Sequence, residues 1–523
     1  MSEFARRACA AARRPLGVLG ALALAVVASG HVGSPDVYFQ GKAGPYDVGV
    51  TIRPPGVVPG LADITIHVPS ADARRVSVRP VFWQTSLAGA PRADEARAVP
   101  GEAGLYSAQL WLMTAGSYSV HVTVEGARGS GTAFVPLNSI ATQRLGMQPA
   151  TAGVLLGLGA FLVIGLLSIV GAGAREGSLE PGASPDPRRR RKARIVTTVF
   201  AGILVLELTA GKAWWGLEDA AYRRSMARPL RVSASTRSEG GHAVIRVALD
   251  DPSWVGGRTT PLVPDHGKMM HLFLIRAPGL DGFAHLHPRR VDPTTFEATL
   301  PPLPAGSYRL YGDVVHASGY ARTVTDTVEI SAGGLSGAAP SDSDDSWLAP
   351  AAAPAEPRSG QDGSVRQLAG GGSMTWERGA EAPRAGRPAS LRFVVRDVNG
   401  QAAVLEPYMS MRGHAAVTRD DGAVFVHLHP MGTISTASQR TFEERARGDT
   451  TAAAITAALA RPSRDGEHAT HGGEPGIVTF PYAFPSPGRY RLWVQVKRAG
   501  VVETGQFDVT VGDSIRTGAR SGT

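Results

Sequence analysis

Cysteine is almost absent from this chain, which has one, Cys9, in 523 residues. A single cysteine cannot form an internal disulfide, so cysteine content does not indicate the redox compartment. The absence of further cysteines also excludes Cys-ligated zinc sites and His-Cys-Met blue-copper sites in the downstream domains. A metal site in those domains would have to use other donors.

Charged residues are also scarce, at 19% of the chain, while glycine (63) and proline (38) are abundant. This composition suits β-rich domains joined by tight turns, and the length predicts three or four structural units. The densest basic run, residues 188–194, lies between two apolar segments. We interpret it by the positive-inside rule as a cytoplasmic membrane flank, so no nucleic-acid partner is expected.

Catalytic constellations are missing from the sequence as well. It contains no nucleophile–base pair, phosphate-binding loop or zinc-protease motif. The acidic residues in Asp281-Gly282 and Asp420-Asp421-Gly422 are typical of turns. The motifs therefore do not predict an enzyme.

Apolar segments predict a membrane-anchored protein. Residues 1–30 are typical of a secretory signal peptide, or of an uncleaved signal anchor with the same orientation. Segments 151–174 and 195–215 are each long enough to cross a bilayer, which takes about 20 residues. The basic loop 175–194 marks the cytoplasmic side, and Glu207 in the second span is either a functional or a structural group. We expect a cytoplasmic-membrane protein whose large domains lie on the periplasmic or extracellular side, with the bilayer and a membrane or periplasmic protein as partners.

Alternating polar and apolar residues predict strands in the outer regions. A turn followed by Gly-x-Tyr and an alternating strand occurs three times, beginning at Gly116, Gly306 and Gly488. This repeat predicts a mostly β protein with three Ig-like or cupredoxin-like β-sandwich domains. The expected domains are 43–146, 229–332 and 373–513, with a disordered linker at 333–372 and, in the last domain, an insertion at 433–476 that contains a helix at 441–460.

The phrase His-Leu-His-Pro occurs twice, at residues 285–288 and 427–430. His271 and His414 precede the two phrases by fourteen and thirteen residues. The first sandwich has the Gly-x-Tyr hairpin without these histidines, so the hairpin belongs to the scaffold and the histidines to an added site. Imidazole is a ligand for copper, zinc and other borderline metals.

The position of the upstream histidines depends on two hairpin turns. In each phrase the two histidines are two residues apart on a strand, so they share one face. Turns at 278–282 and 420–422 are expected to bring His271 and His414 back against these pairs. We expect a three-residue or bulged turn to place the upstream histidine on the same face, and a strict two-residue turn to place it on the other.

Methionine is concentrated beside the same motifs, which hold five of the ten in the chain. Thioether sulfur prefers Cu(I), and imidazole accepts Cu(I), Cu(II) or zinc, so copper is the expected metal and zinc the alternative. Exposed His/Met sites on sheet edges would suit metal exchange, whereas hydrogen-bonded histidines and core methionines would explain the pattern without a metal. The candidate ligands are His271, His285, His287, His414, His427, His429, Met409, Met411 and Met270, with weaker support for His266, His316, Met269, Met431, His468 and His471.

The two regions with these phrases resemble domains of membrane-anchored bacterial proteins. Those domains share a His-Leu-aliphatic run, a Phe-x-His-Leu-His-Pro phrase and a closing Gly-x-Tyr-Arg-Leu strand, which here are residues 271–275, 283–288 and 306–310, while the last region matches through 425–430. The N-terminal region more loosely resembles secreted YtkA/FixH-like sandwiches, which are often linked to copper delivery to oxidases. The resemblance covers roughly half of the chain and implies a sandwich fold and an association with metal, but no reaction.

Three functions are consistent with these features. The first is a membrane-anchored periplasmic protein that binds copper for buffering or for delivery to a membrane partner. The second is an accessory or copper-bearing subunit of a membrane enzyme complex, because the order of elements is similar to the copper subunit of particulate methane and ammonia monooxygenases. That family uses an N-terminal histidine with a downstream HxH, whereas here the HxH motifs lie in the later domains and the N-terminal sandwich offers only His67 and His121. The third is an interaction scaffold of β-sandwich domains.

Overall fold

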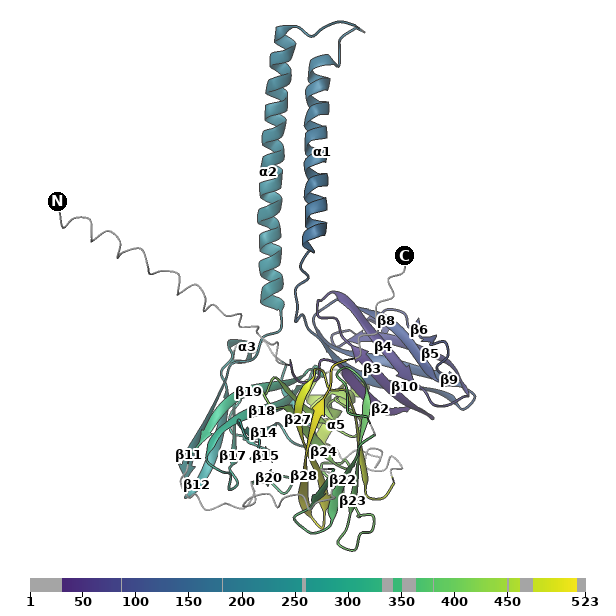
Figure 1. Ribbon diagram of the computed structural model, residues 1–523, viewed down its shortest axis with the longest axis vertical. Coiled ribbons are helices and arrows are strands. Elements are labelled where there is room, and N and C mark those ends of the chain that lie inside the picture. Colours follow the sequence, from purple (N-terminus) through teal and green to yellow (C-terminus); the bar gives the residue numbers. More distant parts are fainter. Residues whose placement is uncertain are drawn as a thin grey trace, which may run out of the picture.

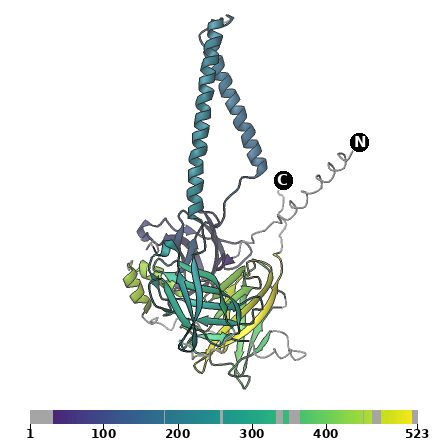
Figure 2. The same ribbon diagram turned by 90° about the vertical axis from the view of Figure 1, so that its left-hand side faces the viewer.

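The protein is described by a computed structural model, which covers residues 31–85, 87–180, 182–255, 260–331, 342–349, 364–379, 381–448, 451–460 and 474–514. Over these residues the chain is mostly β, with six sheets and a pair of long helices that stands apart from them (Figures 1 and 2). The expected signal sequence lies outside the described residues, as do His468 and His471.

Residues 37–139 form the N-terminal sheet pair. Its strands are β2 (Val37–Ala43), β3 (Tyr46–Arg53), β4 (Gly60–His67), β5 (Ala73–Phe82), β6 (Asp94–Glu95), β7 (Arg97–Ala98), β8 (Leu105–Leu112), β9 (Gly116–Gly126) and β10 (Gly129–Ser139), with a short 3-10 helix, η2 (Leu87–Gly89). The sheets have the orders β2-β3-β4-β8-β7 and β10-β9-β5-β6. Alternate residues of β3, from Tyr46 to Ile52, are buried in the core between them, as the sequence pattern predicts.

Residues 232–348 form the central sheet pair. Its elements are β11 (Val232–Glu239), β12 (His242–Leu249), α3 (Pro252–Val255), β13 (Leu262–Val263), β14 (His271–Arg276), β15 (Phe283–Leu286), β16 (Arg289–Arg290), β17 (Thr295–Thr299), β18 (Gly306–His316), β19 (Ala321–Ile330) and β20 (Ser346–Leu348). One sheet has the order β11-β12-β17-β16. The other has the order β13-β18-β14-β15-β20, with β19 paired to β18.

Residues 365–511 form the C-terminal sheet pair. Its elements are β21 (Val365–Gln367), β22 (Ser373–Glu377), β23 (Ala389–Arg396), β24 (His414–Arg419), β25 (Val424–Leu428), α4 (Thr436–Ala446), α5 (Ala452–Ala460), β26 (Ile477–Tyr482), β27 (Gly488–Arg498) and β28 (Val501–Val511). One sheet has the order β21-β22-β23-β26. The other has the order β1-β25-β24-β27-β28, in which β1 (His31–Val32) comes from the start of the described chain.

The Gly-x-Tyr hairpin is present in all three sheet pairs, as β9–β10, β18–β19 and β27–β28. In each, the first strand starts at the glycine, whose φ is 142° or 143° and therefore favours a residue without a side chain. The hydroxyl of Tyr118 accepts a hydrogen bond (3.1 Å) from the backbone four positions upstream, while those of Tyr308 and Tyr490 donate to carbonyls four positions upstream, at 2.8 Å each. The motif thus closes a turn, which explains its presence in the sheet pair that lacks the histidine phrase.

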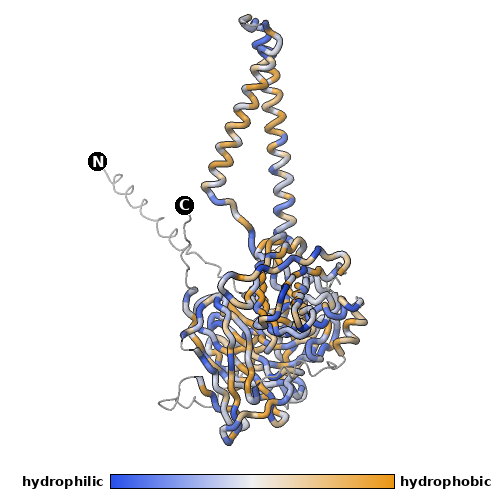
Figure 3. Tube along the Cα trace, turned by 90° about the vertical axis from the view of Figure 1, so that its right-hand side faces the viewer, coloured by the Kyte–Doolittle hydropathy of each residue, from blue (hydrophilic) through white to orange (hydrophobic). Residues whose placement is uncertain are grey.

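The helix pair consists of α1 (Pro149–Glu176) and α2 (Pro187–Ser225), with mean hydropathies of 2.6 and 1.7 in their most apolar windows. Both helices carry exposed hydrophobic residues along their length (Figure 3). At 1.5 Å per residue, helices of this length reach about 42 and 58 Å, so both could cross a hydrocarbon core of about 30 Å. The sheet pairs lie at one end of the helix pair and the α1–α2 connection at the other (Figure 1).

The basic run, residues 188–194, is helical, whereas a loop was expected there. It forms the first turns of α2, because Asp186 caps the helix by accepting a hydrogen bond from the Arg189 N–H (2.6 Å) and Pro187 occupies the first helical position. The connection between the helices is therefore shorter than the expected 175–194. The run still lies at the end of the helix pair away from the sheets (Figure 1).

The expected linker and insertion also differ from the sequence interpretation. Residues 342–349 and 364–372, inside the expected linker 333–372, contain β20 and β21. Their apolar content is low, but β20 pairs with β15 and its flanking aspartates bond to buried partners. The single helix expected at 441–460 is two helices, α4 and α5, which end and begin on either side of Gly448.

Candidate metal centre

The sheets that carry the two histidine phrases pack against each other. Along β14 the side chains alternate, so that Leu272 and Leu274 enter the central core while Phe273 and Ile275 join a separate apolar cluster. That cluster also contains Ala416, Phe425 and Trp493 of the C-terminal sheet pair. The sheet with β14 and β15 and the sheet with β24 and β25 are thus buried against each other. They meet through the faces that point away from their own cores, and the histidines lie on these faces.

Equivalent residues of the two repeats meet reciprocally across this interface. Phe283 of β15 stacks on Trp493 of β27, with ring centroids 4.8 Å apart. Its counterpart in the other repeat, Phe425 of β25, stacks on Tyr311 of β18 at 4.0 Å. Because both contacts join the phrase strand of one repeat to the hairpin strand of the other, the two halves are related by an approximate twofold axis.

Strand register places each upstream histidine on the same face as its phrase. Phe273 pairs with His285, so His271, two residues earlier on β14, lies on their face. In the C-terminal repeat, His427 pairs with the residue two positions after His414. Each repeat therefore presents three histidines to the interface.

The expected relation between turn length and face is wrong for the C-terminal hairpin. Cross-strand partners share a face, and the unpaired chain runs from 276 to 282 in the central hairpin and from 419 to 424 in the C-terminal one. If the upstream histidine is to share a face with its phrase, a spacing of fourteen residues requires an odd number of unpaired residues in the turn. A spacing of thirteen requires an even number. The unequal spacings in the sequence therefore match the two different turns.

Seven histidines gather at the interface, six of them from the two predicted sets and the seventh from the turn before β14. Two groups have ligand nitrogens that all lie within 4.8 Å of one another: His271, His285 and His287, and His266, His414 and His429. We call them the first and the second triplet. His427 lies between them, with its ring centroid 5.3 Å from those of both His271 and His414. These groups could hold metal ions.

Hydrogen bonds at Nδ1 hold two of these imidazoles, and a third has a carboxylate beside its Nδ1. The Nδ1–H of His429 donates to the Ile434 carbonyl (2.8 Å), and that of His287 to the Asp345 carboxylate (3.0 Å). Nδ1 of His427 lies 3.3 Å from an Asp313 carboxylate oxygen. The Nε2 atoms of these three histidines are buried and have no hydrogen-bond partner among the residues that the structure describes. This pattern, in which one nitrogen is held by an outer partner and the other is free, is the one found for metal-bound imidazoles.

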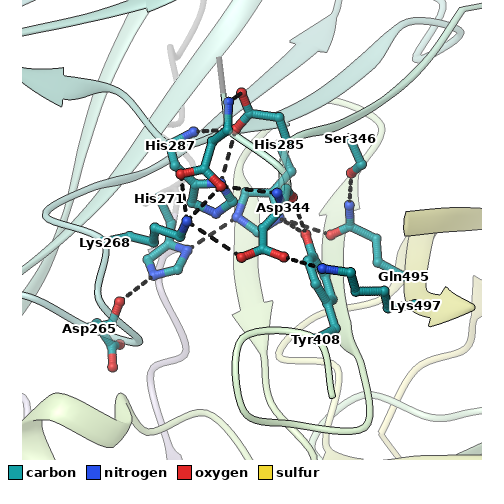
Figure 4. Close-up of polar contacts among 12 residues, drawn as sticks. Asp265, Lys268, His271, His285, His287, Asp344, Ser346, Tyr408, Gln495 and Lys497 are labelled. Atoms are coloured by element: carbon teal, nitrogen blue, oxygen red, sulfur yellow. Dashed lines mark hydrogen bonds and ion pairs between the residues drawn. The ribbon is translucent and has the colours of Figure 1, made fainter. Parts of the chain in front are cut away.

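In the first triplet, a ring nitrogen of His271 and one of His285 face each other. Nδ1 of His285 hydrogen-bonds to Gln495 Oε1 at 3.0 Å, and Nε2 of His271 lies 3.3 Å from the Asp265 carbonyl. Nδ1 of His271 and Nε2 of His285 are 3.2 Å apart (Figure 4). With one proton between them these two nitrogens form a hydrogen bond, and without it they could bind an ion together.

Residues outside the predicted set support the cluster, and sequence reasoning missed them. Gln495 and Asp313 lie opposite His414 and His271 in the strand ladders, yet they bond to His285 and His427 of the opposite repeat. The sequence did contain a sign of these two residues. Each is a polar residue seven positions after the hairpin glycine, within an otherwise apolar strand.

The segment 342–346 covers the first triplet. Asp345 accepts from both the backbone N–H and Nδ1 of His287, at 2.8 and 3.0 Å. The Asp344 carbonyl accepts from the Tyr408 hydroxyl (3.0 Å), and its carboxylate pairs with Lys497 (2.9 Å) (Figure 4). Gln495 Nε2 donates to the Ser346 hydroxyl. An acidic segment that was expected to be linker is therefore an outer shell of the site.

Burial lowers the pKa of five histidines in the cluster. It holds the pKa of His271, His285, His414 and His427 well below the usual range, and neighbouring imidazoles lower it further. Burial also lowers the pKa of His429 to about 4. At neutral pH these rings therefore carry lone pairs that can bind a metal.

The histidines are not the exposed sheet-edge sites that were expected. The six predicted histidines are between 0% and 8% exposed, because the two sheet pairs cover them. The methionines lie mainly in apolar cores: Met270 belongs to the central core, with Met269 partly buried against it, while Met411 and Met431 belong to the N-terminal core. Met409 is buried, and His316 packs on Trp254 and donates to the Thr260 carbonyl.

A protein family described as a domain of unknown function (DUF8832) matches residues 235–332 and 367–513, which span both sheet pairs that contribute histidines. No curated protein matches the chain. Similar solved structures include a tetra-tandem repeat from the extending region of a large adhesion protein (9% identity, 87% of this chain and 71% of that chain, TM-score 0.15) and a protein from Corynebacterium diphtheriae described as membrane anchored (10%, 91% and 94%, 0.14). Another is dimeric latent PorU from Porphyromonas gingivalis (8%, 92% and 34%, 0.14), so the chain spans about a third of that protein. The likeness to YtkA/FixH-like domains stays a prediction.

Proposed function

We propose that this is a membrane-anchored copper-binding protein, with the metal held in the histidine cluster between its central and C-terminal sheet pairs. The proposal rests on a set of buried imidazole nitrogens that have no hydrogen-bond partner within the described part of the chain: Nε2 of His287, His427 and His429, and both ring nitrogens of His414. Each unpaired buried polar atom costs about 1–3 kcal/mol. A bound metal would supply the missing partner at each of them.

The charge of the cluster favours Cu(I) among the metals that imidazole binds. Five of the imidazoles have a lowered pKa and are uncharged at neutral pH, and the cluster is buried. The cost of burying an ion rises with the square of its charge. A monovalent ion on neutral nitrogens is therefore held at lower cost than Zn²⁺. The carboxylate of Asp265 lies 3.6 Å from Nε2 of His266 and that of Asp345 accepts from His287, so both lie at the edge of the cluster and would balance a small positive charge.

Burial of the ligands favours a resident metal over rapid exchange. A partner protein could reach the first triplet only after segment 342–346 moves away from His287. This geometry supports metal storage, or the second function considered above, a copper-bearing subunit of a membrane enzyme complex, over fast buffering. The basic run at the far end of the helix pair supports a location of the sheets outside the cytoplasm.

Metal analysis of the full chain in detergent micelles tests the proposal. The purified protein is loaded separately with Cu(I) under anaerobic reducing conditions, Cu(II) and Zn²⁺, passed through a desalting column and analysed by mass spectrometry for bound metal. We expect retained copper that falls when His285 and His287 are both replaced by Ala. His67→Ala, a change in a histidine of the N-terminal sheet pair, serves as the control and should retain all of it. Copper at background level in the wild type would refute the proposal, and retention of Zn²⁺ alone would replace copper with zinc.

A further inference from the structure

The cluster contains more imidazoles than one metal ion needs. A single ion of this class takes about four protein ligands at about 2.0–2.1 Å, so its ligands lie up to about 4 Å apart. Seven histidines are present, and the two triplets share no residue. Within each triplet the ligand nitrogens are already within 4.8 Å of one another, close to the spacing around one ion.

The approximate twofold relation gives each triplet its own place. His271 and His287 of the first triplet correspond to His414 and His429 of the second. The second triplet is completed from the opposite repeat by His266, whose ring centroid lies 5.6 Å from that of His414 and 5.4 Å from that of His429. The two triplets are therefore separate groups of ligands at related positions.

His427 occupies the space between the triplets. Its ring centroid is 5.3 Å from His271, 5.6 Å from His285 and 4.4 Å from His429, so it approaches both groups. None of the described residues is a hydrogen-bond partner of its Nε2, and its Nδ1 lies beside Asp313. It can therefore donate to an ion on either side.

We infer that the cluster holds two metal ions side by side, one in each triplet, with His427 between them. The inference rests on the proposed function, because it assigns two ions to the same copper-binding cluster. Two Cu(I) ions bring two positive charges, which the carboxylates of Asp265 and Asp345 can offset. The centre is dinuclear, and each half depends on contacts with the opposite repeat.

Metal stoichiometry of the full chain in detergent tests the inference. The Cu(I)-loaded wild type should retain two ions per chain, while His287→Asn and His429→Asn should retain one each and the double variant none. His67→Asn should retain two. His→Asn keeps a polar side chain of similar size, and circular dichroism of each metal-free variant checks that it folds.

The outcomes separate the inference from the proposed function. An absence of bound copper in the wild type would refute both the proposed function and the inference of two ions. One ion per wild-type chain is compatible with the proposed function but overturns the inference of two ions. The loss of both ions from a single variant has the same meaning. A second readout is electron paramagnetic resonance of the oxidised protein: two neighbouring Cu(II) ions give dipolar coupling with a half-field signal in the wild type, which disappears in either single variant. A wild-type spectrum of isolated Cu(II) would also overturn the inference.

Discussion

Replacing Gln495 with Leu should weaken metal binding without removing a ligand. Gln495 is fully buried on β27; its Oε1 accepts from the His285 Nδ1–H at 3.0 Å and its Nε2 donates to the Ser346 hydroxyl. Leucine has a similar volume but neither polar atom. The substitution therefore releases the ring of His285 and the segment at Ser346 together, while all seven histidines remain.

The size of the effect follows from what remains around His285. Loss of an outer-shell partner typically costs about 10- to 100-fold in metal affinity. The Tyr408 hydroxyl, 3.2 Å from the same Nδ1, can take over as acceptor, so the lower end applies. We expect the Kd for Cu(I) to rise about tenfold, which corresponds to about 1.4 kcal/mol.

Competition with a chromogenic Cu(I) chelator measures this change in the detergent-solubilised full chain. The matched control is Gln495→Glu, which keeps an acceptor for His285 and should bind at least as tightly as the wild type. An unchanged Kd in Gln495→Leu would refute the assignment of Gln495 to the outer shell. Equal weakening in both variants would show that packing rather than the acceptor is responsible.

Three further predictions follow from the same structure. Met409 occupies the position equivalent to His266, and both have positive φ in matching turns, so Met409→Leu should weaken binding of Cu(I) but not of Zn²⁺ in the same competition assay. Free Cu(I) at a hundred times its Kd should stabilise the fold by about 2.7 kcal/mol for each bound ion, seen as a higher Tm that is lost when His287 and His429 are both replaced by Asn. Burial lowers the pKa of His121 to about 4; the unfolded state then takes up the proton first as pH falls below about 6.5, so the N-terminal sheet pair should lose about 2 kcal/mol between pH 7 and pH 5. Hydrogen exchange of β9, corrected for intrinsic rates, should show this loss in the wild type and not in His121→Phe.

The strands and the repeated hairpin could be predicted from the sequence because both depend on local patterns. Alternation in 46–53 coincides with β3, and each Gly-x-Tyr begins a hairpin strand. The two apolar segments are likewise helical. Each histidine phrase could be placed on a strand, and its upstream partner nearby, because hairpins are local too.

The union of the two histidine sets could not be predicted in the same way, because it depends on how two sheets dock. One signal was available: 271–275 is apolar at almost every position, which is typical of a strand buried on both faces. Phe273 and Ile275 indeed face the opposite sheet pair. Segment 342–346 was missed for another reason. Composition indicates how much apolar surface a segment can bury, whereas this segment is held by hydrogen bonds that Asp345 and Ser346 accept from the buried side chains of His287 and Gln495.

Neither sheet pair can make the complete centre alone. The central pair would retain His271, His285 and His287 but lose the acceptor Gln495, and the C-terminal pair would lose His266 from the second triplet. Without metal, the docked interface buries several unpaired nitrogens, and the aromatic stacks across it must offset that cost. Metal binding removes the cost only when the halves are docked. By linkage, docking must then strengthen metal binding by the same free energy by which metal strengthens docking.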